Sequence, residues 1–315
     1  MTKAVVATAF GGPEALSVVD VDVPDPGAGE VTIEVRAAGV NPFDYKVYSG
    51  IMGSDESQLP MRLGLEVSGV VTAVGDDARG PAGPVTVGDE VIGYSVPGGY
   101  AGQVTTRASE VFPKPANLSW EVAAGLSLTG TTAYHLLEAT SVDAGDTVLI
   151  HAVSGGVGLT AAQLAVERGA TVIGTASERR HESLREYGVI PVVYGDGLAD
   201  RVREAAPGGV DVALDTVGTD EAVDISLELV EDKHRIATVA AFGRAHEAGI
   251  QLLGNGPGAD PGADIRSRAR LVLTDLASEG RLDVVVAKTF PLDQAAEAHR
   301  FVADGHAGGK VVLVP

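Results

Sequence analysis

The sequence has no cysteine among its 315 residues. Disulfides, thiolate-ligated zinc and cysteine nucleophiles are therefore excluded. It also lacks any apolar run close to the 18 or so residues that a membrane-spanning helix needs. The N-terminus enters a strand-like pattern at once and shows no charged-then-apolar signal peptide. We therefore expect a soluble, cytoplasmic protein.

Basic residues are scarce, with 23 Lys and Arg against 43 Asp and Glu, which gives a formal net charge of −20. A surface this acidic repels phosphate backbones and anionic membranes, so neither nucleic acid nor a membrane is expected as a partner. The 41 glycines are too many for a helical bundle and suit many tight turns between short elements. The length allows two domains that share a cleft, or one large domain.

The first third of the chain has the pattern of β-structure interrupted by turns. Residues 31–36 alternate apolar and polar side chains, as a half-buried strand does, and 67–74 and 91–94 are further short apolar runs. From about Ser119 onward, strand-like runs alternate with segments of helical spacing. This rhythm predicts a parallel, doubly wound sheet. The predicted strands of that sheet are 147–152, 171–173, 189–193, 210–214 and 235–239.

The alternation breaks after Gly254. Residues 255–262 are rich in Gly, Pro and Asp and are predicted to form a linker. Two helices and two strands are expected after it, and this tail is too short to fold alone. We therefore expect it to return to the N-terminal domain.

The strongest local signal is the segment 151–158, with the sequence HAVSGGVG, which joins a predicted strand to a predicted helix. A dinucleotide-binding fingerprint requires this context. Gly155 would let the backbone approach a pyrophosphate, Gly158 would let the helix pack close to the sheet, and the amides between them favour an anion. Val153 replaces the first glycine of the general motif, and a turn required only by geometry is the alternative. The predicted cofactor-binding residues here are Ser154, Gly155, Gly156, Val157 and Gly158.

The end of the second predicted strand indicates which nicotinamide cofactor is bound. A fold that prefers NAD usually places Asp or Glu about 20 residues after the glycines, to hold the ribose 2′-hydroxyl. Here that position falls at Ser177, and Arg179 and Arg180 follow. A hydroxyl and two guanidiniums suit a 2′-phosphate, so we predict NADPH. Two alternatives stay open. Glu178 would hold a ribose diol if the register shifted by one residue, or the arginines are only a solvated helix start.

Several motifs, in order along nearly the whole chain, resemble the zinc-independent, quinone-reductase-like branch of the medium-chain dehydrogenase/reductases, which includes zeta-crystallin and the alkenal and enone reductases. The order of the motifs makes this resemblance more specific than any one of them. The matching segments are GVNPFDYK at 39–46 with Ser49-Gly50, PANLS at 115–119, LTGTTAY at 128–134, the loop at 152–158, Ala298-His299, and GKVVL at 309–313.

The resemblance implies an α/β protein with a GroES-like, β-rich catalytic domain and an inserted Rossmann domain. We place the first part of the catalytic domain at 1–121, the NADP-binding domain at 122–256 and the returning part at 257–315. Zinc-dependent relatives carry a Gly-His-Glu segment and cysteine ligands, whereas this chain has Gly64-Leu65-Glu66. The resemblance thus implies that no metal is bound.

The resemblance also indicates catalytic residues in the segment 41–46. Asn41 would hydrogen-bond the cofactor ribose or the substrate oxygen. Lys46 would stabilise a developing enolate or hydroquinone oxyanion, or else is a surface lysine. Asp44 would orient Lys46 or cap a helix. Many quinone reductases place tyrosine at this lysine position, so Tyr45 and Tyr48 are also candidate proton donors.

Four more residues, two of them within these motifs, are further predicted cofactor contacts, each with plain packing as the alternative. By resemblance, Thr129 lies near the nicotinamide and Tyr194 stacks near the adenosine. Phe242 follows the fifth strand on the nicotinamide side, and Lys310 reaches the cofactor from the tail.

The predicted function is NADPH-dependent hydride transfer to a small quinone or α,β-unsaturated carbonyl. A 2-enoyl thioester reductase is one alternative, although the negative charge disfavours a coenzyme A substrate. A non-catalytic, crystallin-like NADPH-binding protein is the other. We also expect a homodimer, because an open sheet leaves an edge strand, at 250–253, for pairing across a twofold axis.

Overall fold

The computed structural model describes residues 1–305 and 307–315. The chain divides into two compact units, and each unit is formed from segments that are distant in the sequence. The first unit contains Met1–Leu128, Arg270–Ser278 and Val284–Pro315, and the second contains Thr129–Ala269 and Glu279–Asp283. The predicted boundaries, after residues 121 and 256, fall earlier in the chain than the divisions after Leu128 and Ala269.

The first unit is built on a mostly antiparallel sheet of strand order β10-β8-β5-β3-β18-β17, to which β9 adds by pairing with β3. The C-terminal strand β18 pairs antiparallel with β3, and Val311 lies opposite Val40. This register brings the start of β18 beside the end of β3. The strands are β3 (Glu30–Val40), β5 (Glu66–Val74), β8 (Glu90–Tyr94), β9 (Gln103–Arg107), β10 (Val111–Pro113), β17 (Val286–Pro291) and β18 (Lys310–Val314).

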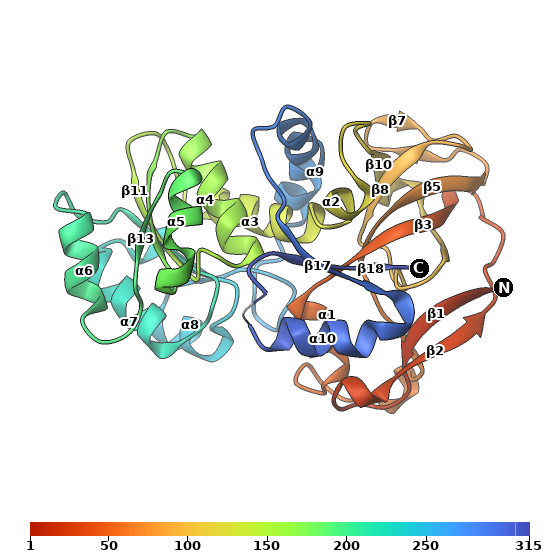
Figure 1. Cartoon of the computed structure of the whole chain (residues 1–315), viewed down its shortest axis with the longest axis horizontal. Helices are drawn as coiled ribbons and strands as arrows, with labels where there is room; N and C mark the ends of the chain where they lie inside the picture. Colours follow the sequence, from red (N-terminus) through yellow and green to blue (C-terminus); the bar gives the residue numbers. More distant parts are fainter. Residues whose placement is uncertain (306) are drawn as a thin grey trace. The chain divides into compact units, whose positions relative to one another are not determined.

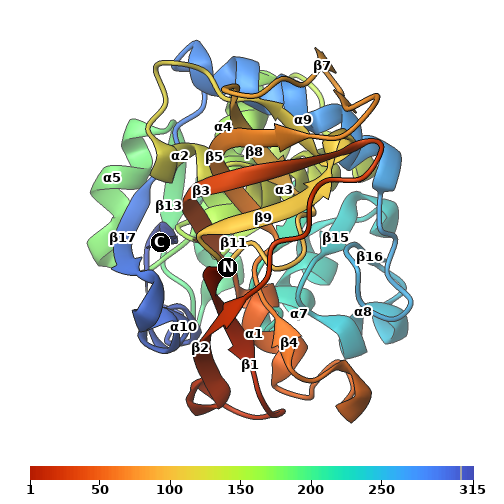
Figure 2. The same ribbon diagram turned by 90° about the vertical axis from the view of Figure 1, so that its right-hand side faces the viewer.

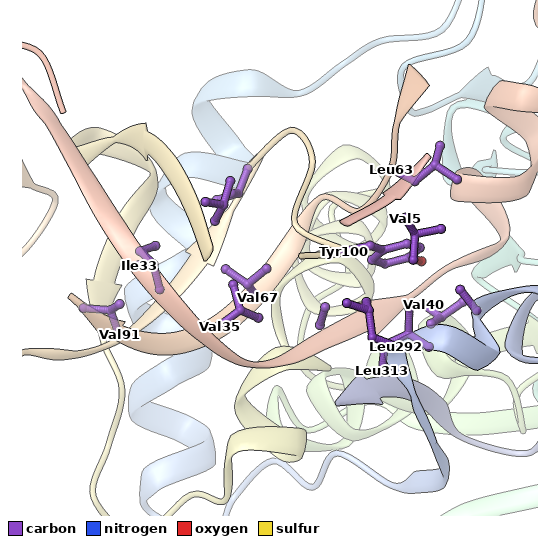
Figure 3. Close-up of a cluster of buried hydrophobic side chains, with 14 of the residues drawn as sticks. Val5, Ile33, Val35, Val40, Leu63, Val67, Val91, Tyr100, Leu292 and Leu313 are labelled. Carbon is purple, nitrogen blue, oxygen red and sulfur yellow. The ribbon is translucent and has the colours of Figure 1, made fainter. Parts of the chain in front are cut away.

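Smaller elements complete the first unit. A second sheet has the order β2-β1-β4 (Figure 2), and β6 pairs with β7. Both sheets and the C-terminal segment contribute apolar side chains to one core, where Val5, Leu292 and Leu313 lie together (Figure 3). The remaining elements are β1 (Thr2–Ala7), β2 (Leu16–Val21), β4 (Met61–Arg62), β6 (Arg79–Gly80), β7 (Gly83–Pro84), α1 (Pro42–Tyr48), α2 (Trp120–Ala124) and α10 (Ala295–Ala303), with short 3-10 turns between them.

The second unit contains the predicted doubly wound sheet. Its six strands are all parallel, in the order β13-β12-β11-β14-β15-β16. The strand order reverses at β11, and open α/β sheets bind ligands at such a reversal, outside the carboxyl ends of the strands. The strands are β11 (Thr147–His151), β12 (Thr171–Thr175), β13 (Val189–Val192), β14 (Val212–Asp215), β15 (Ile236–Thr238) and β16 (Gln251–Leu252).

The strands of this sheet form because their residues are almost continuously apolar, as burial by helices on both faces requires. None of the helices in the described part of the chain is long and apolar enough to span a bilayer. The helices are α3 (Ser127–Ala139), α4 (Gly156–Glu167), α5 (His181–Glu186), α6 (Leu198–Ala205), α7 (Asp220–Leu229), α8 (Phe242–Ala248) and α9 (Ala263–Ser278), and the division between the units falls within α3 and α9.

The segment 255–262, predicted as a linker, is packed against the second unit. A Cβ on Gly262 would lie 2.2 Å from the ring of His135, which is fully buried in α3. The carboxylate of Asp260 lies 3.5 Å from His135 Nε2, and Arg266 Nη1 donates to Thr132 Oγ1 over 3.0 Å. The glycines of the segment 255–262 therefore permit close packing on a helix. Composition alone does not distinguish such a packed segment from a flexible linker.

Candidate functional site

The glycine-rich turn after β11 leaves the first amides of α4 without a side-chain cap. Ala152 has a φ of +56°, Gly155 N donates to Ala152 O over 3.0 Å, and Gly155 occupies the N-cap position of α4. The first turn of the helix carries no acidic residue, and residues 154–157 are half-buried. This helix N-terminus is suited to an anion because its orphan N–H groups and its dipole both favour negative charge.

Two glycines explain how the turn departs from the general motif. A Cβ on Gly158 would lie 2.6 Å from Ala152 O and 2.8 Å from Val153 Cα, so only glycine allows α4 to approach the loop this closely. Val153 replaces the first glycine of the motif, and its fully buried side chain fills the space beside Gly174 of β12. A Cβ on Gly174 would lie 2.4 Å from Val153 Cγ1. The valine is therefore compensated by a glycine in the neighbouring strand.

The end of β12 is attached to this turn. Ala152 N donates to Thr175 Oγ1 over 2.9 Å, and Val153 N donates to Thr175 O over 3.1 Å. Ser177 follows two residues after Thr175 and is half-buried, whereas Arg179 is exposed. Arg180 is half-buried and closes the short 3-10 turn Glu178–Arg180. The fold thus places the residues predicted for a 2′-phosphate beside the predicted pyrophosphate loop.

Tyr194 lies just after the carboxyl end of β13, and its side chain is 53% exposed. The loop around it is held by Arg201, a residue that the sequence analysis did not identify. The guanidinium of Arg201 donates to the carbonyl groups of Val193, Gly195 and Asp196 at 2.8–2.9 Å. Tyr194 is therefore presented on an ordered loop, with its ring available for stacking.

A buried hydrogen-bond network that the sequence analysis missed shapes the ends of β14 and β15. Asp215 Oδ1 accepts from Val217 N (2.9 Å) and Gly218 N (2.8 Å), and Asp215 Oδ2 accepts from Thr238 Oγ1 (2.7 Å). Thr238 Oγ1 in turn accepts from the amides of residues 240 and 241, which lead into α8. The available signal was an aspartate that directly ends a buried apolar strand.

Phe242 begins α8, and its side chain is 38% exposed. A Cβ on Gly256 would lie 2.1 Å from the Phe242 ring, so this glycine lets the segment 255–262 pack on the ring. Thr129, the third residue of α3, is buried. The roles of Phe242 and Thr129 in cofactor binding stay predictions.

His151 ends β11 directly before the glycine-rich turn and is buried. Its Nε2 lies 3.2 Å from Ser226 Oγ, and burial lowers the pKa of His151 to about 4, so its ring is neutral near pH 7. Among the residues that the structure describes, no group of three or more His, Asp or Glu side chains is arranged to hold a metal ion.

In the first unit, a buried charged cluster joins three separate segments. Lys310 Nζ lies 2.5 Å from both Asn41 Oδ1 and Glu66 Oε1, and Asn41 Nδ2 donates to Glu66 Oε1 over 2.9 Å. The other Glu66 oxygen accepts from Leu128 N over 2.8 Å. Asn41, Glu66 and Lys310 are each at most 4% exposed. The side chains of Asn41 and Lys310, predicted to contact the cofactor or substrate, thus contact each other and Glu66.

Asp44 caps α1 from within its first turn. Its Oδ2 accepts from Asn41 N over 2.8 Å and from Tyr100 OH over 2.7 Å, which completes a capping box with Asn41. Burial raises the pKa of Asp44 to about 6, although both hydrogen bonds and the charge of Lys310 oppose that rise. Of the two roles considered for Asp44, the geometry fits helix capping.

The three candidate proton donors of α1 differ in exposure. Tyr48 is buried, and its hydroxyl lies 2.9 Å from His299 Nδ1. Tyr45 and Lys46 are half-buried; burial raises the pKa of Tyr45 and lowers that of Lys46. Tyr45 and Lys46 are therefore the two candidates that remain accessible.

Leu65, at the position of the histidine in zinc-dependent relatives, is half-buried.

Family models match most of the chain in two segments. Residues 27–116 match the alcohol dehydrogenase GroES-like domain, and residues 187–313 match the zinc-binding dehydrogenase model. These matches confirm the predicted combination of a GroES-like domain with a Rossmann sheet.

Two relatives that match this chain over nearly their full length are named as reductases or oxidoreductases. Human quinone oxidoreductase is 31% identical, covering 100% of this chain and 98% of that protein. A 2-haloacrylate reductase of a Burkholderia species is 33% identical, covering 100% and 99%. The spectinabilin polyketide synthase system protein NorB of Streptomyces orinoci is 34% identical over 90% of this chain, which spans only 13% of the length of that much longer protein.

Solved structures agree with these relatives. Escherichia coli quinone oxidoreductase, solved in complex with NADPH, superposes with a TM-score of 0.86 at 28% identity, over 99% of this chain and 100% of that chain. A protein described as an NAD-dependent alcohol dehydrogenase also superposes with a TM-score of 0.86, at 32% identity over 99% of each chain. The chain therefore belongs to the medium-chain dehydrogenase/reductase family, in its quinone-oxidoreductase branch.

Proposed function

We propose that the protein reduces a quinone or an α,β-unsaturated carbonyl with NADPH, without a metal. The observation that carries this proposal is the uncapped N-terminus of α4 beside the segment Ser177–Arg180. The first feature suits a pyrophosphate and the second a 2′-phosphate, and the hydrogen bonds of Thr175 attach the two to each other. NADPH, when bound, supplies the hydride.

The residues of the chain would then bind the cofactor and stabilise the negative charge that forms on the acceptor. The amides at residues 156 and 157 would hold the pyrophosphate, and Arg179 and Arg180 would hold the 2′-phosphate. Hydride addition leaves negative charge on the acceptor oxygen, where Lys46 would stabilise it and Lys46 or Tyr45 would donate a proton.

A panel of acceptors, monitored by the loss of NADPH absorbance, tests this proposal. We expect turnover of quinones or conjugated enones, and little turnover of a 2-enoyl coenzyme A thioester, because a chain of charge −20 opposes an anionic substrate. Fast reduction of the thioester alone would favour the thioester-reductase alternative. NADPH binding without turnover of any acceptor would favour the non-catalytic alternative.

Replacing both Arg179 and Arg180 by alanine should weaken NADPH binding at least about tenfold and leave NADH binding nearly unchanged. Each charge-assisted hydrogen bond to a phosphate contributes roughly 1.5–3 kcal/mol, and NADH has no 2′-phosphate to lose one. Fluorescence titration with both cofactors measures the two affinities. Arg203, which pairs with Asp200 and Glu228, provides the control substitution. Equal weakening of both cofactors would contradict the assignment.

Chelation should leave activity unchanged. The chain has no cysteine and has Leu65 at the position where zinc-dependent relatives have a histidine, so we propose that no metal takes part in the reaction. Activity after prolonged dialysis against a strong chelator, with elemental analysis of the purified protein, measures this. Stoichiometric zinc, or activity that disappears and returns with added zinc, would refute it.

We also propose a homodimer, and the structure modifies the predicted contact. The strand β16 lies at the edge of the sheet, but Asp260 N already donates to Leu252 O and Gly254 N donates to Asp260 O. A partner strand would therefore pair with residues before Leu252 or displace Asp260. Light scattering should give a mass near twice the 32.1 kDa of one chain, and a monomer mass at all concentrations would contradict the proposal.

A further inference from the structure

The short helix α1 is held by buried polar side chains on one face. Asp44 and Tyr48 lie one helical turn apart and are both at most 2% exposed, whereas Tyr45 and Lys46 are half-buried. Successive residues of an α-helix are rotated by about 100°, so Lys46 lies roughly 200° around the helix from Asp44. The contacts of the buried face therefore determine the direction in which Lys46 points.

The two ends of this face are anchored separately. Near the start of α1, Asp44 accepts the hydroxyl hydrogen bond of Tyr100 at 2.7 Å. Near its end, Tyr48 OH lies 2.9 Å from Nδ1 of His299, in the neighbouring helix α10 (Figure 1). The Tyr48 and His299 rings also stack, with centroids 5.6 Å apart, and the Tyr100 ring lies edge-on to His299 at 5.7 Å.

His299 is an unfavourable choice for packing alone. It is fully buried, and its Nε2 has no hydrogen-bond partner among the described residues. A buried polar atom without a partner lowers stability, and an apolar side chain of similar size would avoid that loss. Burial also lowers the pKa of His299 to about 4, so the ring is neutral near pH 7 and makes no ion pair there. What the histidine adds is its hydrogen bond to Tyr48.

We propose that His299 is a positioning residue, which acts through Tyr48 to fix the orientation of α1 and hence of Lys46 and Tyr45. This inference rests on the proposed function, because the Tyr48–His299 hydrogen bond matters for catalysis only if Lys46 or Tyr45 acts on the acceptor. A helix of seven residues is too short to be stable alone, so its orientation depends on tertiary contacts such as these. Misplacement of a reacting group by about 1 Å can lower a rate up to about 100-fold.

The double variant Tyr48→Phe/His299→Leu separates positioning from stability. Replacing both partners of a buried hydrogen bond by apolar groups of similar shape is often nearly neutral for stability. We therefore expect a melting temperature close to that of the wild type, with kcat for the acceptor lowered roughly tenfold and NADPH affinity unchanged. The single variant His299→Asn keeps a hydrogen-bonding atom near the position of Nδ1 and should retain more activity than His299→Leu.

Two comparisons connect the effect to α1. In a Lys46→Ala/Tyr45→Phe background, the double variant should cause little further loss, because the groups that it positions are already absent. Tyr94→Phe removes the hydroxyl of another buried tyrosine of the first unit, in β8, and should leave kcat unchanged. An equal tenfold loss in the background variant, or an unchanged kcat in the double variant, would overturn the proposal.

Hydrogen exchange, measured by mass spectrometry on the protein without cofactor, tests the anchor without any assay of activity. Amides of residues 44–49 should exchange faster in Tyr48→Phe/His299→Leu than in the wild type or in Tyr94→Phe. Unchanged exchange at α1 would refute the anchoring by His299, whatever the kinetics. A wild-type protein inactive toward every quinone and enone would instead refute the proposed function, and the exchange result would still decide whether His299 anchors α1.

Discussion

Lys310→Met should lower the free energy of unfolding by about 3–5 kcal/mol, the usual cost of leaving a buried charge without its partner. The carboxylate of Glu66 is fully buried, and Lys310 Nζ lies 2.5 Å from its Oε1. Without the ammonium, Glu66 retains hydrogen bonds only from Asn41 Nδ2 and Leu128 N among those described. Urea denaturation at neutral pH measures the change.

Two further variants separate this effect from a general loss of packing. Lys3→Met breaks an exposed pair, in which Lys3 Nζ and Asp20 Oδ1 are 3.5 Å apart, and should change stability by at most about 1 kcal/mol. Glu66→Gln/Lys310→Met removes both charges and should recover part of the stability lost in the single variant. A loss below about 1 kcal/mol in Lys310→Met would show that the pair is not effectively buried.

The same variant tests the prediction that Lys310 contacts the cofactor. If the ammonium serves only Glu66 and Asn41, folded Lys310→Met should bind NADPH with nearly wild-type affinity at low temperature. A loss of tenfold or more, with NADH binding affected equally, would assign Lys310 to a part of the cofactor that both molecules share.

Local sequence patterns predicted the Rossmann sheet and located the glycine-rich turn after its first strand because the relevant information is local. Most strands of the second unit are short and largely apolar runs, and the turn predicted to bind an anion lies directly between β11 and α4. The role of Gly158 follows from its position in that turn. The compensation of Val153 by Gly174 was not predicted, because it depends on the pairing of β11 with β12.

The cluster in the first unit could not be predicted from spacing, because its members are distant in the sequence. Asn41 and Lys310 are 269 residues apart, and only the antiparallel pairing of β18 with β3 brings them together. The contact of Tyr48 with His299 spans 251 residues. A motif identified Asn41, Asp44 and Lys310 as notable residues, but it did not indicate that their side chains serve one another.

The proton donor illustrates what the structure adds to the motif. By sequence, Lys46 was the best-placed cation, and Tyr45 and Tyr48 were further candidate proton donors. In the structure, the Tyr48 hydroxyl is buried against His299. Burial raises the pKa of Tyr45, which makes its hydroxyl a weaker acid, and lowers the pKa of Lys46, which makes its ammonium a stronger one. The two shifts run in opposite directions and favour Lys46 over Tyr45 as the proposed source of a positive charge and a proton.

Lys46→Ala should lower kcat/KM for a quinone or enone by roughly 10–100-fold and leave NADPH affinity nearly unchanged. Hydride addition places negative charge on the acceptor oxygen, and a nearby cation stabilises that charge more than it stabilises the neutral ground state. The estimate lies somewhat below the loss typical of one oxyanion donor. Steady-state kinetics with a saturating cofactor, together with a separate titration of NADPH, measure the two quantities.

The companion variants decide between the roles that Lys46 and Tyr45 can play. Lys46→Arg keeps the charge and should retain more activity than Lys46→Ala if electrostatic stabilisation dominates, because arginine stabilises an oxyanion but is a far weaker acid. If proton donation dominates, the arginine variant should lose nearly as much as the alanine variant. The loss relative to the wild type should then shrink at high pH, where Lys46 itself loses its proton. Tyr45→Phe should be the milder change in either case. Wild-type activity in Lys46→Ala would show that Lys46 takes no part in the reaction. A large loss of NADPH binding in that variant would instead make Lys46 a cofactor ligand. Tyr45 would then be the accessible proton donor of α1.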